Sequence, residues 1–370
     1  MPADNFEIAV VGGGLVGSAL AYGLAKRGRR IIVLDEGDLA HRASRGNFGL
    51  VWMQGKGDGA PAYAAWTRRS IELWPDFARE LRAASGIEVT YARTGGFSFC
   101  LDEAELAARA AMLRRMADQD GPGASDAELI DGAALRREFP ALGRAVVGAT
   151  FCPHDGHVNP LLLLRALRVA GVRQRVVYRP GARIERIEAG AGFRLIGPAL
   201  AVEAERVVLA AGLGSAPLAP LVGLRAPLRP NRGQVLVTQR LPAFLSFACS
   251  QIRQTAEGTV MLGDTKEDVG FDDGTTNGAA AQLAARAVRV FPRLARVRVV
   301  RQWAALRVMT PDSLPIYERS EHHPGVFLAA CHSGVTLAAV HAEDLAAAVL
   351  APQLTALAPF SAQRFVVEAA

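Results

Sequence analysis

The N-terminal cluster GGGLVG is the feature that most constrains the fold of this chain. It follows the β-branched run Phe6–Val11 and precedes an Ala- and Leu-rich stretch at 18–27, after which residues 30–34 form a second strand-like run. A strand, a glycine turn, a helix and a second strand within about 30 residues are typical of the unit that builds a parallel sheet. The chain is therefore predicted to begin with a Rossmann-like α/β unit.

The spacing Gly12-x-Gly14-x-x-Gly17 predicts what this unit binds. The first glycine permits a tight turn, the second lets the backbone approach a pyrophosphate, and the third lets the helix pack on the strand. Asp35 would then accept hydrogen bonds from ribose hydroxyls, and the adjacent Glu36 could share or take over that role. A chance glycine-rich turn is the alternative, but the strand and helix that the motif requires are both present.

The run VVLAAG at 207–212 helps to separate the possible dinucleotides. It is a hydrophobic strand ending in small residues, which permit close approach of a ligand where such sheets bind cofactors. Alone it predicts only a strand and a turn. Together with the N-terminal fingerprint, it favours a flavin.

The net charge of the chain is weak evidence about its binding partners. A net charge of +6 and a pI near 9.5 raise nucleic acid or an anionic membrane surface as candidates. The positive charge is nearly all arginine, with lysines only at Lys26, Lys56 and Lys266, and it is scattered beside Asp and Glu. A solvated surface is therefore favoured, and no nucleic-acid partner is expected.

Metal binding and membrane insertion are not expected either. The cysteines stand far apart without zinc or cluster spacing, and the pair His154 and His157 has no third ligand in sight. A loop capping the helix at Asn159 is the preferred interpretation of that pair. The N-terminus lacks the pattern of a signal peptide, and no apolar run reaches about 18 residues. We therefore expect a cytoplasmic protein without an integral membrane segment, with peripheral membrane association left open.

Elsewhere the chain alternates between helical and strand-like periodicity. Helices are predicted at 62–84, 103–119, 160–170, 276–291 and 335–350. Strands are predicted at 175–178, 182–187, 193–196, 205–209, 233–238, 259–262 and 326–329.

The order of these motifs carries a resemblance to a known family. GGGLVG, Asp35, a Ser/Arg/Asn/Gly segment near residue 45, VVLAAG, WAALRVMTPDSLPIY and CHSGVTLAA together resemble the D-amino-acid oxidase and glycine oxidase group of FAD enzymes, over essentially the whole chain. More narrowly, RGNFGLVWMQGKG, RQWAALRVMTPD and CHSGVTLAAVHA are similar to the flavin subunits of multi-subunit bacterial amine dehydrogenases. These are the opine oxidases, the D-hydroxyproline dehydrogenase β subunit and the hydrogen cyanide synthase subunit that oxidises glycine.

The resemblance implies an α/β (α+β) fold with two domains. A discontinuous, Rossmann-like FAD-binding domain is expected at 1–84, 150–226 and 318–370. A substrate domain with a mostly antiparallel sheet is expected at 85–149 and 227–317.

The resemblance also implies a set of cofactor contacts. The ADP part is assigned to Gly12, Gly14, Leu15, Val16, Gly17, Asp35, Glu36, Ile184, Ala211 and Gly212, and the loop toward the isoalloxazine to Ser44, Arg45, Asn47, Gly49 and Leu50. The segment Ser333, Gly334, Val335, Thr336 and Leu337 is implied to lie under the flavin N1–C2=O edge, where a helix N-terminus would stabilise the anionic reduced flavin. Relatives with covalent flavin use a cysteine near Ala305, so non-covalent FAD is expected.

Two side chains are candidates for contact with the substrate. The resemblance implies that Arg307 pairs the substrate carboxylate, and a planar guanidinium suits bidentate binding of that group. A structural ion pair with a carboxylate such as Asp312 is the alternative. His332 lies where the flavin is expected, as a base or as a residue that orients its loop; amine oxidation by hydride transfer needs no strong base. Trp52 is assigned to the core or to the pocket wall, and Lys56 has no role.

The implied function is an FAD-dependent dehydrogenase that oxidises a C–N bond next to a carboxylate, by hydride transfer to flavin N5. The substrate would be an amino acid, an imino acid such as D-proline or D-hydroxyproline, or an opine. The resemblance also implies that the electrons pass to partner proteins and not to oxygen. Because the chain itself lacks cluster-type cysteine spacing, such a partner would carry an iron–sulfur centre or a second flavin. A self-contained glycine or D-amino-acid oxidase producing hydrogen peroxide, a flavin-bearing assembly subunit and a nicotinamide enzyme are the alternatives.

Overall fold

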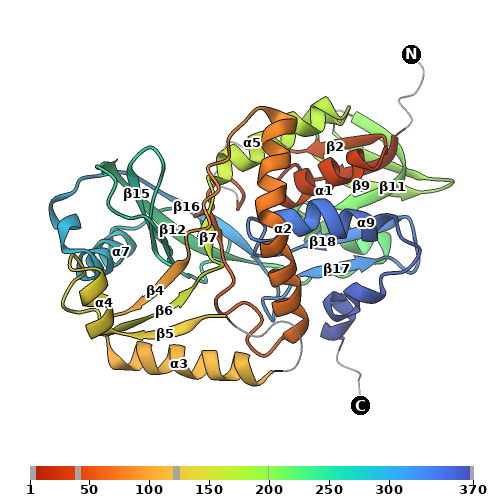
Figure 1. Ribbon diagram of the computed structural model, residues 1–370. Helices are drawn as coiled ribbons and strands as arrows, with labels where there is room; N and C mark the ends of the chain where they lie inside the picture. The colour runs from red at the N-terminus through yellow and green to blue at the C-terminus, as the bar shows by residue number, and fades with distance from the viewer. Residues whose placement is uncertain (1–5, 38–42, 120–125, 199, 367–370) are drawn as a thin grey trace.

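The computed structural model describes residues 6–37, 43–119, 126–198 and 200–366, which form two halves (Figure 1). In the first half, an eight-stranded sheet has the order β17-β18-β11-β1-β2-β8, with β10 on β11 and β9 on β10. β1 pairs in parallel with β2 and β11, so the predicted Rossmann-like unit is present. Its strands are β1 (Phe6–Val11), β2 (Ile31–Asp35), β8 (Val177–Pro180), β9 (Arg186–Ala189), β10 (Phe193–Gly197), β11 (Leu200–Leu209), β17 (Ile316–Arg319) and β18 (Val326–Ala330).

Both faces of this sheet are buried, which explains why its central strands are apolar throughout. Successive side chains of a strand point to opposite faces, and Val10 packs with α1 (Leu15–Lys26) in one core while Val11 packs in the other. The helical layer on the first face consists of α1, α2 (Pro61–Ser85), α5 (Pro160–Arg173), α8 (Ala338–Val340), η4 (His341–Leu345) and α9 (Ala346–Leu350). Shorter turns at 212–222 and 355–365 complete this half, namely η1 (Gly212–Gly214), α6 (Ser215–Leu218), η2 (Ala219–Val222), η5 (Thr355–Phe360) and η6 (Ala362–Phe365).

The second half contains two four-stranded sheets, in the orders β14-β15-β12-β16 and β13-β4-β6-β5. All their pairings are antiparallel except β13 with β4. One core joins them, in which Phe97 and Phe247 lie with ring centroids 4.6 Å apart. The strands are β4 (Gly96–Cys100), β5 (Glu128–Asp131), β6 (Gly148–Cys152), β12 (Arg229–Arg240), β13 (Ala248–Cys249), β14 (Ile252–Gln254), β15 (Thr259–Gly263) and β16 (Val299–Met309). The helices are α3 (Glu103–Asp118), α4 (Gly132–Glu138), α7 (Asn277–Val290) and η3 (Pro292–Arg296).

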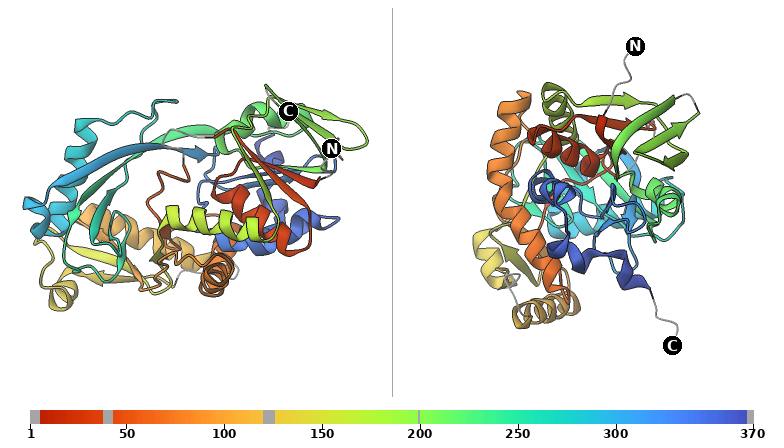
Figure 2. Two further views of the ribbon diagram at one scale, coloured as in Figure 1. Left: turned by 90° about the horizontal axis from the view of Figure 1, so that it is seen from above. Right: turned by 90° about the vertical axis from the view of Figure 1, so that its right-hand side faces the viewer.

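The two halves are joined by elements that bring distant parts of the sequence together. β3 (Leu50–Val51) pairs with β7 (Gly156–His157), and β16 runs from the second half toward the first, as the left view of Figure 2 shows. The half with the parallel sheet and the half with the mostly antiparallel sheets therefore meet along β3, β7 and the end of β16.

The α/β (α+β) fold class predicted from the sequence is confirmed, with several shifted element bounds. The strand predicted at 182–187 is wrong in its first part, because the Ala182 N–H donates to Asp35 O at 2.8 Å and β9 begins only at Arg186. The helix predicted at 335–350 is divided into α8, a π-helical turn and α9. The predicted domain boundary at residue 150 falls inside β6, and the division into domains stays a prediction.

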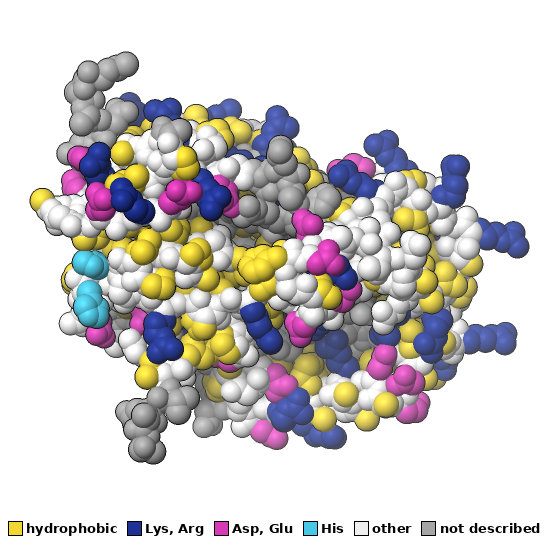
Figure 3. Space-filling view, turned by 180° about the vertical axis from the view of Figure 1, so that it is seen from behind, with side chains coloured by type: hydrophobic (Ala, Val, Ile, Leu, Met, Phe, Trp, Pro, Cys, Tyr) yellow, Lys and Arg dark blue, Asp and Glu magenta, His cyan; other side chains and the backbone are white. Residues whose placement is uncertain are grey.

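In the described part of the chain, no single helix is long and apolar enough to cross a membrane. The two helical segments Ala338–Leu350 and Thr355–Phe365 would together have the length and composition of a membrane span, but they are bent by 117° relative to each other. Basic side chains on the surface shown in Figure 3 are dispersed among acidic and apolar ones.

Candidate functional site

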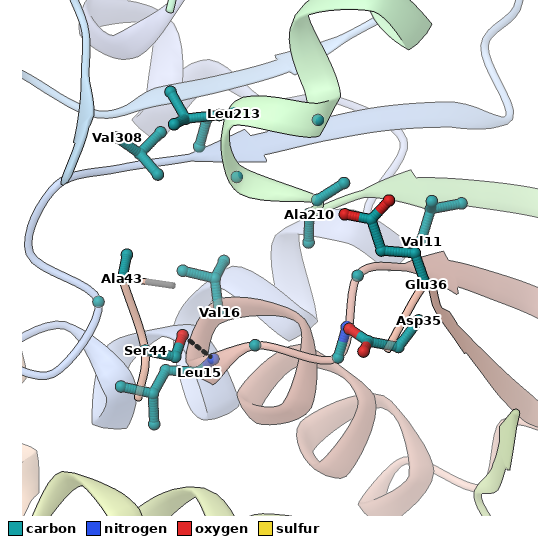
Figure 4. A pocket seen from close by; sticks show the side chains of 18 of the residues that line it. Val11, Leu15, Val16, Asp35, Glu36, Ala43, Ser44, Ala210, Leu213 and Val308 are labelled. Atoms are coloured by element: carbon teal, nitrogen blue, oxygen red, sulfur yellow. Dashed lines mark hydrogen bonds between the residues drawn. The ribbon is translucent and has the colours of Figure 1, made fainter. Parts of the chain in front are cut away.

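The glycine turn after β1 is held by contacts that only glycine permits. Gly12 has φ +104°, and a Cβ there would lie 2.4 Å from Ala210 O; a Cβ on Gly17 would lie 1.9 Å from Gly12 O. Gly14 is the N-cap of α1 and offers no capping side chain. The Leu15 N–H at the helix start donates to Ser44 Oγ at 2.9 Å, the bond drawn in Figure 4. The turn thus presents backbone N–H groups at a helix N-terminus, the arrangement that binds a pyrophosphate.

The acidic residue at the end of β2 is fixed against this turn. Asp35 Oδ2 accepts from the Gly13 N–H at 2.6 Å, and Oδ1 accepts from the Gly37 N–H at 3.1 Å. On the other side, Arg168 Nη2 donates to Gly13 O at 2.7 Å. A carboxylate held in this way keeps further lone pairs for the hydroxyls of a ribose.

The glycine turn and Asp35 line a cavity of about 790 Å³, which is within the usual size range of a cofactor site. Figure 4 shows Val11, Asp35 and Glu36 on one side of it and Leu213 and Val308 on another. Most predicted cofactor residues line the cavity: Gly12, Gly14, Leu15, Val16, Asp35, Glu36, Ser44, Arg45, Asn47, Ile184, Ala211, Gly212 and Gly334, together with His332. The residues present therefore fit an extended dinucleotide.

The remaining predicted residues lie outside the lining. They are Gly17, Gly49, Leu50, Arg307, Ser333, Val335, Thr336 and Leu337. Gly17 packs directly against Gly12 of the turn. Thr336 joins β3 to α2, since its Oγ1 donates to Leu50 O at 3.2 Å and its carbonyl accepts from Trp74 Nε1 at 2.8 Å. Val335 and Leu337 are buried in the core. Direct cofactor contacts of these residues stay predictions.

Other residues of the lining escaped the sequence reasoning. Cys331 and Val308 belong to the quoted motifs CHSGVTLAA and WAALRVMTPDSLPIY, so a signal for them existed. Arg168 lies on α5 and Phe271 in the segment after β15, and neither stands in a motif. Only the tertiary fold brings those two side chains to the cavity.

The segment that follows Ser44 packs against β16. Gly49 has φ +93°, and its N–H donates to Asn47 Oδ1 at 2.8 Å. A Cβ on Gly46 would lie 2.3 Å from the Ala305 Cβ, and Gly46 O accepts from Trp303 Nε1 at 3.1 Å. The glycines therefore allow this segment to press against the strand that carries Arg307.

Trp52 packs beside Gly96 and is buried, in agreement with its assignment to the core or to the pocket wall.

Arg307 is already held by acceptors of the protein. Its Nη1 donates to Asn231 Oδ1 at 2.7 Å, its Nη2 donates to Thr265 O at 2.6 Å, and it forms an ion pair with Asp264. The ion-pair alternative gave Asp312 as an example of the partner carboxylate; Asp264 takes that place, and Asp312 pairs with Arg364 at 2.7 Å. The role of Arg307 toward a substrate carboxylate stays a prediction.

A polar cluster surrounds His332, one of the residues that line the cavity. Ser333 Oγ accepts from Lys56 Nζ at 2.7 Å and from Tyr63 OH at 2.9 Å, and it lies 3.3 Å from His332 Nδ1. Burial lowers the pKa of His332 well below its ordinary value, and the positive charges of Lys56, Arg307 and Lys266 add to this effect. His332 is therefore neutral at pH 7. Sequence reasoning gave Lys56 no role, because its partner is 277 positions away.

No group of three or more potential metal ligands gathers in the described ranges. His154 Nε2 pairs with Asp126 at 2.9 Å, whereas His157 lies in β7, where burial lowers its pKa to about 4. The Asn159 side chain accepts from the Leu161 and Leu162 N–H groups and caps α5, as predicted.

The site, with its glycine turn, fixed acid and long cavity, is that of a flavin-dependent oxidoreductase, and the comparisons agree. Residues 7–348 match the family model described as FAD dependent oxidoreductase (DAO). The chain belongs to this family, whose members include oxidases of amine and imine C–N bonds, and its cofactor is non-covalently bound FAD. Cys331 lines the cavity, and its burial raises the pKa of its thiol to about 12, so the thiol is protonated at neutral pH.

Among individual proteins, an opine oxidase subunit of Agrobacterium tumefaciens (strain Ach5) is 43% identical over 361 residues, which cover 97% of each chain. Hydrogen cyanide synthase subunit HcnC of Pseudomonas aeruginosa is 28% identical, with 84% of each chain covered. The crystal structure of glycine oxidase from Geobacillus kaustophilus is similar with a TM-score of 0.89 and 25% identity, over 98% of this chain and 100% of that one. The family resemblance inferred from the sequence is confirmed.

Proposed function

We propose that this chain oxidises the C–N bond of an amino acid, an imino acid or an opine and passes the electrons to partner subunits. The single observation that carries the proposal is the long cavity at the glycine turn, whose lining includes His332 and whose neighbour Ser333 accepts a hydrogen bond from the Lys56 ammonium at 2.7 Å. A cavity that suits FAD at its glycine turn and has an ammonium group next to its lining suits an amine that bears a carboxylate. The 43% identity to a protein named as an opine oxidase subunit supports the same substrate class.

The overall reaction removes two electrons and two protons from the substrate. The C–H bond next to nitrogen breaks with its electron pair, the nitrogen loses a proton, and a C=N bond forms; the imine then hydrolyses. FAD supplies the hydride acceptor, N5 of the flavin. The protein residues bind and orient the amine so that its α-carbon faces that acceptor.

Arg307 is proposed to hold the substrate carboxylate. Its guanidinium contacts Asp264 and acceptors of β12 and the segment after β15, so a substrate carboxylate would replace Asp264 in the same fork. His332 is proposed to orient the amine or its own loop, because a neutral imidazole both donates and accepts one hydrogen bond. Ser333 to Leu337 are proposed to lie under the flavin N1–C2=O edge.

The experiment that tests the reaction is anaerobic reduction of the bound flavin. The purified chain, loaded with FAD, is mixed without oxygen with D-proline, D-hydroxyproline, glycine, sarcosine and opines, and the loss of the visible absorbance of oxidised flavin is followed. We expect at least one of these compounds to bleach the flavin. If none does, the assignment to C–N oxidation is wrong.

The path of the electrons is proposed separately. Two relatives are named as subunits, which favours a partner that carries an iron–sulfur centre or a second flavin. The similarity to glycine oxidase favours instead a self-contained oxidase that produces hydrogen peroxide. Turnover with oxygen alone is compared with turnover in the presence of co-expressed neighbours or an artificial dye. Rapid peroxide production by the isolated chain would support the oxidase, and residence in the cytoplasm is expected in either case.

A further inference from the structure

Lys56 is a partly buried cation without a carboxylate partner in the described part of the chain. Its ammonium donates to Ser333 Oγ at 2.7 Å, and no ion pair among the described residues includes it. Lys26, by contrast, pairs with Glu80 at 2.7 Å and Glu343 at 2.6 Å. An ammonium carries three donor hydrogens, so two remain for a further partner.

The carboxylates nearest to Lys56 are engaged elsewhere. Asp264 pairs with Arg307, and Asp155 accepts from the Met53 N–H at 2.5 Å and from Gln54 Nε2 at 2.8 Å. Burial raises the pKa of Asp155 to about 7, so this carboxyl is only partly charged at neutral pH. Burial also lowers the pKa of Lys56 to about 8, although the charges of Asp264 and Asp155 act in the opposite direction.

The place of this ammonium is next to the cavity. Ser333, which holds it, stands between His332 and Gly334, and both of these residues line the cavity. Tyr63 donates to the same Ser333 oxygen at 2.9 Å and so fixes the acceptor. Lys56 therefore adds a second positive charge beside the neutral His332, separate from that of Arg307.

We propose that Lys56 is a specificity-determining residue that receives a second carboxylate of the substrate while Arg307 receives the first. The inference rests on the proposed function and narrows its substrate class to amino acids that carry another carboxylate. A desolvated ammonium with spare donors binds such a group with a charge-assisted hydrogen bond, which a neutral amide at the same place does not replace.

The test uses two probes that differ in that one group, iminodiacetate and its monoamide. Anaerobic flavin reduction of the FAD-loaded chain gives an apparent Kd and a limiting rate for each probe. We expect the wild type to bind iminodiacetate more tightly than the monoamide. Lys56→Met should weaken iminodiacetate binding by on the order of 30-fold or more and leave the monoamide nearly unchanged, whereas Lys56→Arg should restore much of the preference.

Lys266→Met is the matched control. Lys266 is exposed, and its charge also acts on His332, so its loss removes one positive charge from a solvated position. We expect it to change both Kd values by less than about twofold, because solvent screens an exposed charge. FAD content and visible spectra of all variants establish that each one is folded.

Several outcomes would overturn the inference. One is an equal loss of affinity for both probes in Lys56→Met, and another is a loss of limiting rate at unchanged Kd, which would assign Lys56 to proton transfer. A third is a flavin that amino acids with a single carboxylate reduce but that iminodiacetate does not. That last result leaves the proposed function intact, while reduction by no amine at all removes the proposed function itself.

Discussion

The Asp35 carboxylate and the Gly13 backbone lie 2.6 Å apart, with Gly13 N–H donating to Asp35 Oδ2. This bond ties the end of β2 to the turn that follows β1, although 22 positions separate the two residues. The residue assigned to the ribose thus also fixes the shape of the phosphate-binding turn. Removing the Asp35 carboxylate should therefore weaken FAD binding in two ways, through the lost ribose contact and through the altered phosphate-binding turn.

Asp35→Ala should weaken FAD binding by roughly 10- to 100-fold, since a hydrogen bond to a charged group contributes about 1.5–3 kcal/mol. FAD retained after dialysis and titration of the apoprotein measure the effect. Asp131→Ala is the control, because Asp131 also accepts backbone N–H bonds but caps α4 in the other half. A loss of FAD in Asp131→Ala equal to that in Asp35→Ala would contradict a specific role for Asp35.

Gly17→Ala should abolish FAD binding and lower the thermal stability of the chain. The new Cβ would lie 1.9 Å from Gly12 O, so the turn and α1 must move apart. Gly278 in α7 is a matched helical glycine whose Cβ would meet nothing within 4 Å. Gly278→Ala should raise the free energy of unfolding by about 0.5–1 kcal/mol and leave FAD content unchanged. Equal stability of Gly17→Ala and wild type would show that the clash is relieved without cost.

Local spacing explains why the nucleotide half could be predicted and the substrate end could not. Gly12, Gly14 and Gly17 all shape the same short turn and helix start, so their spacing can be recognised in a single sequence. The contact of Lys56 with Ser333 spans 277 positions and joins the turn before α2 to the loop after β18, which no local pattern relates.

The carboxylate that pairs with Arg307 could not be predicted for the same reason. Asp312 is near Arg307 in sequence, but β16 continues to Met309 and carries Asp312 away toward Arg364. Asp264 reaches Arg307 from the end of β15, because β15 and β16 both pair with β12. The pairing of β15 and β16 with β12, which the sequence pattern did not specify, therefore determines the contact between Asp264 and Arg307.

Arg307→Met tests the proposed carboxylate contact against a purely structural role. If Arg307 binds substrate, the apparent Kd should rise by an amount equivalent to about 2–5 kcal/mol, with FAD content unchanged. Asp264→Asn is the companion variant, since it breaks the ion pair and leaves the guanidinium in place. It should keep or improve substrate affinity. If both variants weaken binding equally, Arg307 acts by holding Asp264 and not by contacting the substrate.

Stability should fall in mild acid because of His341, a fully buried residue at the start of η4. Its Nε2 lies 2.6 Å from Tyr317 OH, and burial lowers its pKa to about 3. The unfolded chain titrates this group near its ordinary pKa of about 6.5, so between those values the unfolded state binds more protons. The free energy of unfolding should therefore decrease by up to about 1.4 kcal/mol per pH unit from this residue as pH falls from about 6.5 toward 3.

Urea unfolding of wild type and His341→Gln at several pH values between 7 and 4 isolates this effect, because other titrating groups are common to both chains. The glutamine amide can still bond the Tyr317 hydroxyl but cannot take up a proton in this range. The difference in unfolding free energy between the two proteins should thus shift in favour of the variant as pH falls. A difference that stays constant with pH would mean that His341 is protonated in the folded protein as readily as in the unfolded one.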